Sequence, residues 1–236
     1  MRFAVPVLAW LGTLALCTAA QVPSPVQVPD TLAQRLAPCT ACHGQQGRAV
    51  SGAYVPRIAG KSAGYLYEQL INFRDGRRQN ATMAMFLADL PDAYLREIAA
   101  HFAALDLPHA AGPAAPASPT ALARGEVIAR RGDTSAKLPA CADCHGEQLT
   151  GALPAMPGLL GLPRDYLIAQ LGAWQTGSRH ATAPDCMADI ARRLSPTDSS
   201  AVADWLAAQP VPQPMRPATK PERPAPLRCG SAGHAP

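Results

Sequence analysis

The sequence predicts an all-α protein of two tandem domains that arose by internal duplication, and three observations carry this prediction. The stretch CTACH at Cys39 to His43 recurs as CADCH at Cys141 to His145, 102 residues later. The segments around both copies repeat in the same order, which is the mark of a duplicated unit. No segment alternates polar and apolar residues with a strand period, so we expect little sheet.

The repeat extends well beyond the two pentapeptides. Insertions of a few residues shift the offset slightly and fall in expected loops, where a duplicated fold tolerates them. The matched positions include Pro56 and Pro157, Gly60 and Gly161, Tyr65 and Tyr166, Gln69 and Gln170, Phe73 and Trp174, Arg78 and Arg179, and Met83 and Met187.

Each repeat should contain a first helix, the pentapeptide, a middle helix and a closing helix. We expect Asp30 to cap the first helix, and apolar residues at helical spacing predict a middle helix over 65–73. Pro91 should open the closing helix of the first repeat, and Ser195 with Pro196 that of the second.

Composition sets the expected boundaries. Residues 106–119 are rich in proline and alanine, as in an interdomain linker, and the chain after Pro210 is proline-rich, basic and without period, which predicts a mostly unstructured tail. The expected parts are a signal peptide at 1–20, a first domain at 21–107, a linker at 108–119, a second domain at 120–209 and the tail at 210–236.

The first 20 residues have the pattern of an export signal. Arg2 supplies a positive start, no charged residue follows through Ala20, and Thr18-Ala19-Ala20 is typical of a cleavage site. The alternative is an uncleaved anchor, because this uncharged run approaches the length that spans a membrane. We therefore expect export to the periplasm, with a membrane anchor only if the segment is retained.

The pentapeptide Cys-x-x-Cys-His is the attachment signature of c-type haem. Two thiols at this spacing can form thioethers with the haem vinyl groups, and the adjacent imidazole becomes an axial ligand of the iron. The sequence thus predicts two covalently bound haems, held by Cys39, Cys42 and His43 and by Cys141, Cys144 and His145. A structural zinc protein is a competing interpretation, but three visible ligands per site fit zinc poorly.

The matched motifs Pro-x-x-x-Gly, Tyr-Leu-x-x-Gln-Leu, Gly-x-Arg and Met-Ala resemble those of the cytochrome c4 family, over roughly residues 31–209. The resemblance implies two class I cytochrome c domains, each with a low-spin haem that has His and Met as axial ligands. It also implies that the protein shuttles electrons in the periplasm.

The repeat selects the methionine ligands that this resemblance implies. Met83 lies 40 residues after His43, Met187 lies 42 after His145, and both begin a Met-Ala pair. Met85 is the alternative in the first repeat, where its other role would be to fill a gap in the core. Met156 lies too close to His145 and belongs to a loop.

Two further pairs are candidate haem contacts. The resemblance implies that Pro56 and Pro157 pack on the haem near the proximal histidine, whose ring N–H needs an acceptor; a plain turn proline is the alternative. Arg78 and Arg179 would bind haem propionates, or else be solvated at a helix end. We expect the remaining histidines to be surface or structural residues: His101, His109, His180 and His234.

Outside the haem motifs, the chain after residue 20 has two cysteines, Cys186 and Cys229. In an exported chain such an even remainder favours a disulfide, here one that ties the tail to the second domain. Alternatively Cys186, which precedes Met187, could itself ligate the second iron.

A formal net charge of +4 gives no electrostatic case for nucleic acid, and no nucleophile constellation or phosphate loop indicates catalysis. The favoured function is electron transfer between a respiratory donor and a terminal oxidase or reductase, with redox proteins as partners. The rival is a haem subunit of a periplasmic dehydrogenase, or a di-haem oxidase acting on a small sulfur compound.

Overall fold

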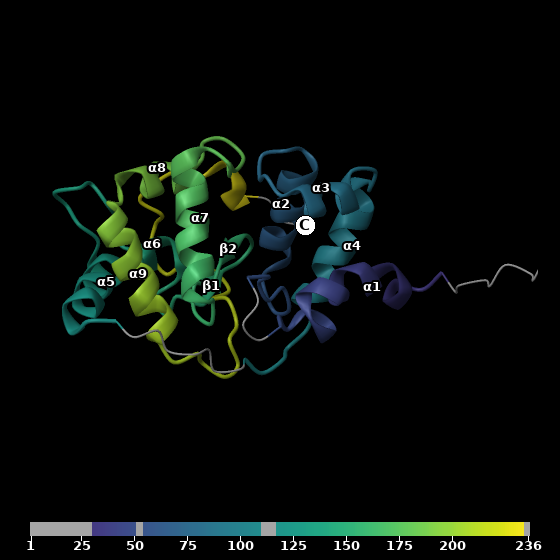
Figure 1. Ribbon diagram of the computed structural model, residues 1–236, viewed down its shortest axis with the longest axis horizontal. Helices are drawn as coiled ribbons and strands as arrows, with labels where there is room; N and C mark the ends of the chain where they lie inside the picture. The colour runs from purple at the N-terminus through teal and green to yellow at the C-terminus, as the bar shows by residue number, and fades with distance from the viewer. Residues whose placement is uncertain (1–29, 51–53, 110–116, 234–236) are drawn as a thin grey trace, which may run out of the picture.

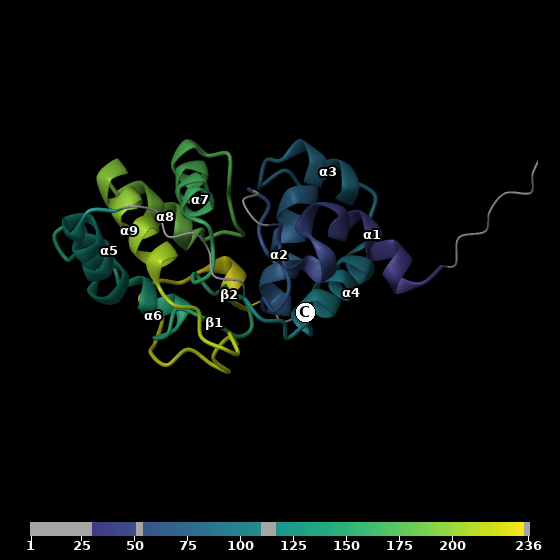
Figure 2. The ribbon, with the colours of Figure 1, turned by 60° about the horizontal axis from the view of Figure 1, so that its bottom comes forward.

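The computed structural model describes residues 30–50, 54–109 and 117–233, which form two helical halves side by side (Figures 1 and 2). The first half contains α1 (Leu32–His43), the 3-10 turn η1 (Gln45–Gly47), α2 (Ala63–Arg74), α3 (Ala81–Leu87) and α4 (Asp92–Ala103). The second contains α5 (Pro119–Arg131), α6 (Cys141–His145), β1 (Gly151–Ala152), β2 (Met156–Pro157), α7 (Arg164–Thr176), α8 (Cys186–Arg193), α9 (Pro196–Ala208) and η2 (Gly230–Gly233). The all-α prediction is confirmed, since the two short strands are the only sheet in the described residues.

Polar side chains cap the N-termini of several helices, and two of these helix starts differ from the prediction. The Thr31 hydroxyl, rather than Asp30, caps α1, because Asp30 is held in an ion pair with Arg35. Helix α3 was not predicted, and it forms because the Asn80 side chain accepts the Met83 N–H at 3.0 Å. The closing helix α9 begins as predicted, with Ser195 as its cap and Pro196 in its first turn.

Each half has its own hydrophobic core. In the first half, α2 and α4 pack around Leu66, Leu95 and Phe102. In the second, α5, α7 and α9 enclose Ile128, Leu167 and Trp205. Two separate cores agree with the predicted duplication; the expected domain boundaries stay a prediction, because residues 110–116 lie outside the described part.

Helix α5 approaches α9 so closely that only glycine fits at the crossing. A Cβ built on Gly125 would lie inside van der Waals contact of the Ala201 carbonyl oxygen and 2.6 Å from the Trp205 Cβ. Gly125 therefore allows α5 and α9 to pack directly against each other. Helix α5 also packs against α6.

The prediction of a mostly unstructured tail is wrong for residues 210–233. This segment has no helix before η2, but it adds to the β1–β2 hairpin through bonds from Leu153 N to Ala218 O (2.8 Å) and from Ala218 N to Gly151 O (2.9 Å). Met215 packs against the second core. Periodicity could not reveal this segment, because it is held by irregular backbone contacts.

The predicted disulfide is present: Cys186 and Cys229 are bonded, with Cα atoms 5.2 Å apart. It closes a loop of 43 residues between the start of α8 and the tail, for which loop-closure entropy predicts a stabilisation of about 4 kcal/mol. Cys186 is therefore not available as an iron ligand in this state.

No helix in the described residues is long and apolar enough to cross a bilayer. The predicted signal peptide, residues 1–20, lies outside the described part.

Replacing Gly125 with valine should lower the free energy of unfolding by about 1–3 kcal/mol, because the added atoms force α5 and α9 apart. The matched control is Ala123→Val on the exposed side of the same helix, which should cost only about 0.6 kcal/mol in helix propensity. Thermal unfolding of the haem-loaded protein, followed by circular dichroism, compares the two. Equal losses would contradict a close helix crossing at Gly125.

Candidate functional site

The first pentapeptide forms the last turns of α1. Cys39, Cys42 and His43 stand at helical spacings of three and four residues, so their side chains share one face. Cys39 is half-buried and Cys42 exposed, and both are free thiols. The helix ends at Gly44, where a φ of +76° suits glycine and turns the chain away behind the histidine.

The second pentapeptide forms a helix of its own, α6, whose start is held by a bond from the Ala140 N–H to the Asp143 carboxylate at 3.0 Å. Cys141 and Cys144 are both free and half-buried. Burial raises the pKa of the Cys141 thiol to about 12, so this group is a neutral thiol at neutral pH.

Both motif histidines are oriented by a proline carbonyl. His43 Nδ1 lies 2.8 Å from the Pro56 oxygen, and His145 Nδ1 lies 2.7 Å from the Pro157 oxygen. Because a carbonyl only accepts, Nδ1 carries the hydrogen and Nε2 keeps its lone pair, which is the state that binds a metal. Burial lowers the pKa of both histidines, which further favours the neutral ring.

The candidate methionines differ in exposure. Met83 on α3 is half-buried and packs against the first core, whereas Met85 is 69% exposed. Met187 is half-buried in α8, and Met156 lies in β2. Both predicted ligands thus lie in short helices that follow the middle helix of their half, as the repeat indicates.

Arg78 and Arg179 meet between the two halves. Arg78 donates to Gln69 of its own half (2.9 Å) and to Gln170 of the other half (2.7 Å). Arg179 does the reverse, donating to Gln170 (2.7 Å) and to Gln69 (2.9 Å). The two backbones also form an antiparallel bridge here, so the contact has the reciprocity of a twofold axis.

Each of these guanidinium groups also stacks on an aromatic ring of its own half. Arg78 lies 4.5 Å from the Phe73 ring centroid, and Arg179 lies 3.8 Å from that of Trp174. Arg179 is only 4% exposed, so the alternative of a solvated helix end is wrong for it. Burial, and then the nearby charge of Arg78, lowers the pKa of Arg179.

Arg179 is buried and Arg78 half-buried, and in the described residues their side-chain bonds go to amide and phenol oxygens. In the part of the chain that the structure describes, no hydrogen bond or ion pair joins Arg78 or Arg179 to a carboxylate. Two like charges buried this closely are costly without a counter-charge, and the carboxylates of two haems would supply one. The thiol pairs, oriented imidazoles and unpaired arginines therefore fit two c-type haems.

The joining role of Gln69 and Gln170 was missed in the sequence. The signal was available, because a polar residue recurs at the same position of both apolar middle helices. The histidines outside the motifs fall where expected: His101 packs edge-on against Phe102, and His180 is exposed. His109 is half-buried, and burial lowers its pKa to about 4, while His234 lies outside the described residues.

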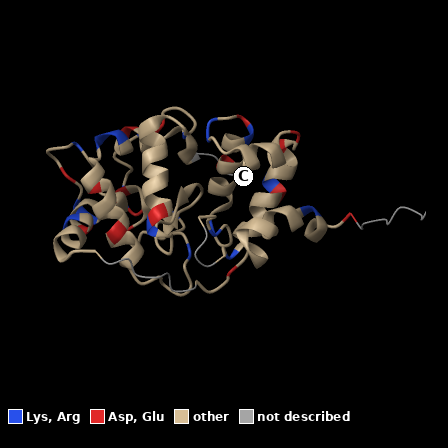
Figure 3. Cartoon of the chain, in the orientation of Figure 1, with Lys and Arg blue, Asp and Glu red and all other residues tan. Residues whose placement is uncertain are grey.

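The zinc interpretation gains no support. Among the described residues, no three His, Cys, Asp or Glu side chains are grouped so that they could hold a metal ion on their own. Basic and acidic residues are interspersed over both halves, which agrees with the absence of an electrostatic case for nucleic acid (Figure 3).

No family model matches the chain, but curated relatives do. It is 38% identical over 175 residues to a thiosulfate dehydrogenase electron acceptor of Thiomonas intermedia, covering 74% of this chain and 80% of that protein. It is also 32% identical to a cytochrome c4 of Pseudomonas aeruginosa over 174 residues, covering 73% of this chain and 84% of that protein.

Two solved structures are similar. Reduced cytochrome c4 from Pseudomonas stutzeri superposes with a TM-score of 0.62 and 29% identity, covering 74% of this chain and 94% of that one. A thiosulfate dehydrogenase (TsdBA) from Marichromatium purpuratum gives a TM-score of 0.64 and 35% identity. The match covers 73% of this chain but only 36% of that one. With its two haem motifs in tandem helical domains, the chain belongs to the cytochrome c4 family of di-haem c-type cytochromes.

Proposed function

We propose that this di-haem electron carrier accepts electrons from a thiosulfate-oxidising dehydrogenase and passes them to a respiratory oxidase or reductase. The proposal that the donor is a thiosulfate-oxidising dehydrogenase rests on the sequence identities of the relatives. Thiosulfate dehydrogenase electron acceptors are 38% and 37% identical to this chain, against 32% for the cytochrome c4 of P. aeruginosa. The rival, a haem subunit of a dehydrogenase or a di-haem oxidase that itself acts on a small sulfur compound, is less favoured, because these relatives are named as electron acceptors or cytochromes.

The haem irons would have His and Met as axial ligands, His43 with Met83 and His145 with Met187. The prolines hold each imidazole with Nε2 free, and α3 and α8 supply half-buried thioethers. Cys39, Cys42, Cys141 and Cys144 would form the thioether links to the two haems. Bound in this way, haem supplies one-electron redox chemistry, and closed axial positions leave no site for substrate on the iron.

Arg78 and Arg179 would bind propionates of the two haems. The reciprocal bonds to Gln69 and Gln170 place both guanidinium groups at the contact between the halves, and among the described residues these bonds go to amide oxygens rather than to carboxylates. A positive charge beside a haem stabilises the reduced iron, so this pair would raise the reduction potentials of both haems.

The proposed location is the periplasm. Thioether attachment of haem takes place outside the cytoplasm, and the disulfide between Cys186 and Cys229 suits an oxidising compartment. Residues 1–20 would then be the export signal, followed by domains at 21–107 and 120–209, a linker at 108–119 and the tail at 210–236.

Removing a methionine ligand should open one iron. Met83→Ala and Met187→Ala should each let half of the reduced haem bind carbon monoxide, seen as a change in the visible spectrum. The exposed Met85 and the hairpin residue Met156 provide matched controls, because alanine there should leave both irons closed. Carbon monoxide binding by the unaltered protein would overturn the closed-iron assignment.

Arg78→Gln should lower the reduction potentials of both haems by on the order of 50 mV, since one buried positive charge is lost at their shared contact. The control is Arg77→Gln, whose guanidinium already has the carboxylate of Asp75 as a partner at 3.1 Å. Spectroscopic redox titration measures both variants. Potentials equal to those of the unaltered protein would argue against a propionate role for Arg78.

Mixed with a thiosulfate dehydrogenase and thiosulfate, the oxidised protein should be reduced at both haems in a stopped-flow spectrometer. Raising the salt concentration should slow this reaction only slightly, because the charge of +4 is small and dispersed. A cytochrome c4 of 32% identity provides the reference for donor preference. Equal or slower reduction of our protein than of that cytochrome would exclude the proposed donor.

A further inference from the structure

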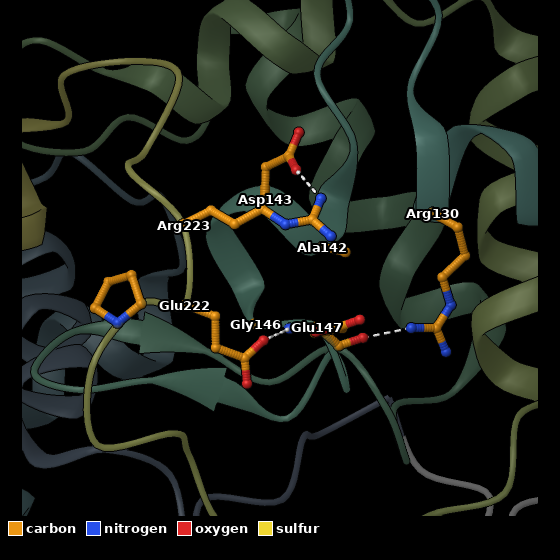
Figure 4. Close-up of a pocket in the computed structure, with 8 residues that line it drawn as sticks. Arg130, Ala142, Asp143, Gly146, Glu147, Glu222 and Arg223 are labelled. Carbon is orange, nitrogen blue, oxygen red and sulfur yellow. Dashed lines mark hydrogen bonds and ion pairs between the residues drawn. The ribbon is translucent and has the colours of Figure 1, made fainter.

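The C-terminal strap, residues 210–230, lies outside the repeat and crosses the second half. After pairing with the β1–β2 hairpin at Ala218, it reaches α6, the helix of the second pentapeptide. There the Glu222 carboxylate accepts the Glu147 N–H at 3.2 Å, and Arg223 pairs with Asp143 at 3.3 Å (Figure 4). Asp143 stands between the two cysteines of the motif, so the strap covers the haem-attachment helix itself.

Little space remains between the strap and α6. A polar cavity of about 90 Å³ lies beneath Pro221, Glu222 and Arg223, which is room for a few water molecules. Arg130 and the carboxylates around this cavity make it unsuitable for an apolar contact with a partner protein (Figure 4).

The end of the strap is fixed to the opposite side of the proposed haem site. Cys229 is bonded to Cys186, next to the candidate ligand Met187, and Gly230 N donates to Pro184 O at 2.9 Å. Five residues lie between Arg223 and Cys229, and the six residue steps can span at most about 20 Å. Over this distance the strap passes from α6, which carries His145, to α8, which carries Met187, so it would run beside a haem held between these two residues.

Among the described residues, the haem-motif side chains of the first half are more exposed than those of the second. Cys42 is exposed, whereas its counterpart Cys144 is half-buried. His43 is half-buried, whereas its counterpart His145 is only 6% exposed. On α3, Met85 and Phe86 are 69% and 47% exposed, and this helix carries no charged residue.

We propose that the strap closes the edge of the second haem to protein partners, so that partners exchange electrons with the first haem only. An electron from a donor would reduce the ferric iron of the first haem. It would then pass to the ferric iron of the second haem, leaving the first oxidised and ready for another. This proposal rests on the His–Met ligation in the proposed function, but not on the identity of the donor.

The test measures the accessibility of each haem directly. In the oxidised protein, haem methyl protons give resolved, paramagnetically shifted NMR signals, and a soluble neutral gadolinium chelate broadens those that it can approach. We expect the first haem to be affected several-fold more than the second. The variant Cys186→Ala/Cys229→Ala, which frees the strap without leaving a thiol beside Met187, should expose the second haem and leave the first unchanged.

Arg216→Ala is the matched control, since Arg216 lies in the same strap but pairs with Asp106 of the first half. It should leave both haems as in the unaltered protein. If the disulfide variant does not fold, Glu222→Ala/Arg223→Ala releases the strap from α6 at little cost, because these contacts are at the surface.

Equal broadening of both haems in the unaltered protein would overturn the proposal, as would protection of the second haem that persists in a folded variant with a freed strap. Neither result depends on thiosulfate dehydrogenase. Failure of that enzyme to reduce the protein would instead count against the proposed donor and leave the strap proposal standing.

Discussion

Two guanidinium groups at the contact between the halves, one buried and one half-buried, are the constraint on which the arrangement of the halves depends. Arg78 and Arg179 share the same two glutamine acceptors, so neither half can rotate without breaking bonds on both sides. Glutamine satisfies their hydrogen bonds but not their charge. In the proposed function, haem propionates would supply the missing negative charge, which would couple the assembly of the two domains to haem loading.

The duplicated sequence predicts much of this structure because the repeat itself is informative. The choice between Met83 and Met85 as a candidate ligand, for example, is open in the first copy alone, and the counterpart Met187 favours Met83. The proline carbonyls that orient His43 and His145 are likewise found as a matched pair. Features that recur within each half could largely be predicted, because two copies of one fold keep the contacts that build each copy.

Features that occur once were predicted poorly. The path of residues 210–233 depends on irregular backbone bonds to the hairpin, which leave no periodic pattern in the sequence. The cap of α1 moved to Thr31 because an ion pair engaged Asp30, a competition between two local partners that residue type alone does not decide. The joining of the halves through Gln69 and Gln170 needs the relative position of two domains, which neither repeat contains by itself.

The pairing of Cys186 with Cys229 also bears on how the chain matures. Six cysteines follow residue 20, and four of them must stay reduced until haem is attached, while the other two must oxidise. Cys229 is the last of the six in chain order, so during the proposed export both haem motifs would emerge before the correct disulfide could form. Sequence order thereby separates the two kinds of thiol chemistry in time, and a tail cysteine placed ahead of the motifs would invite mispairing.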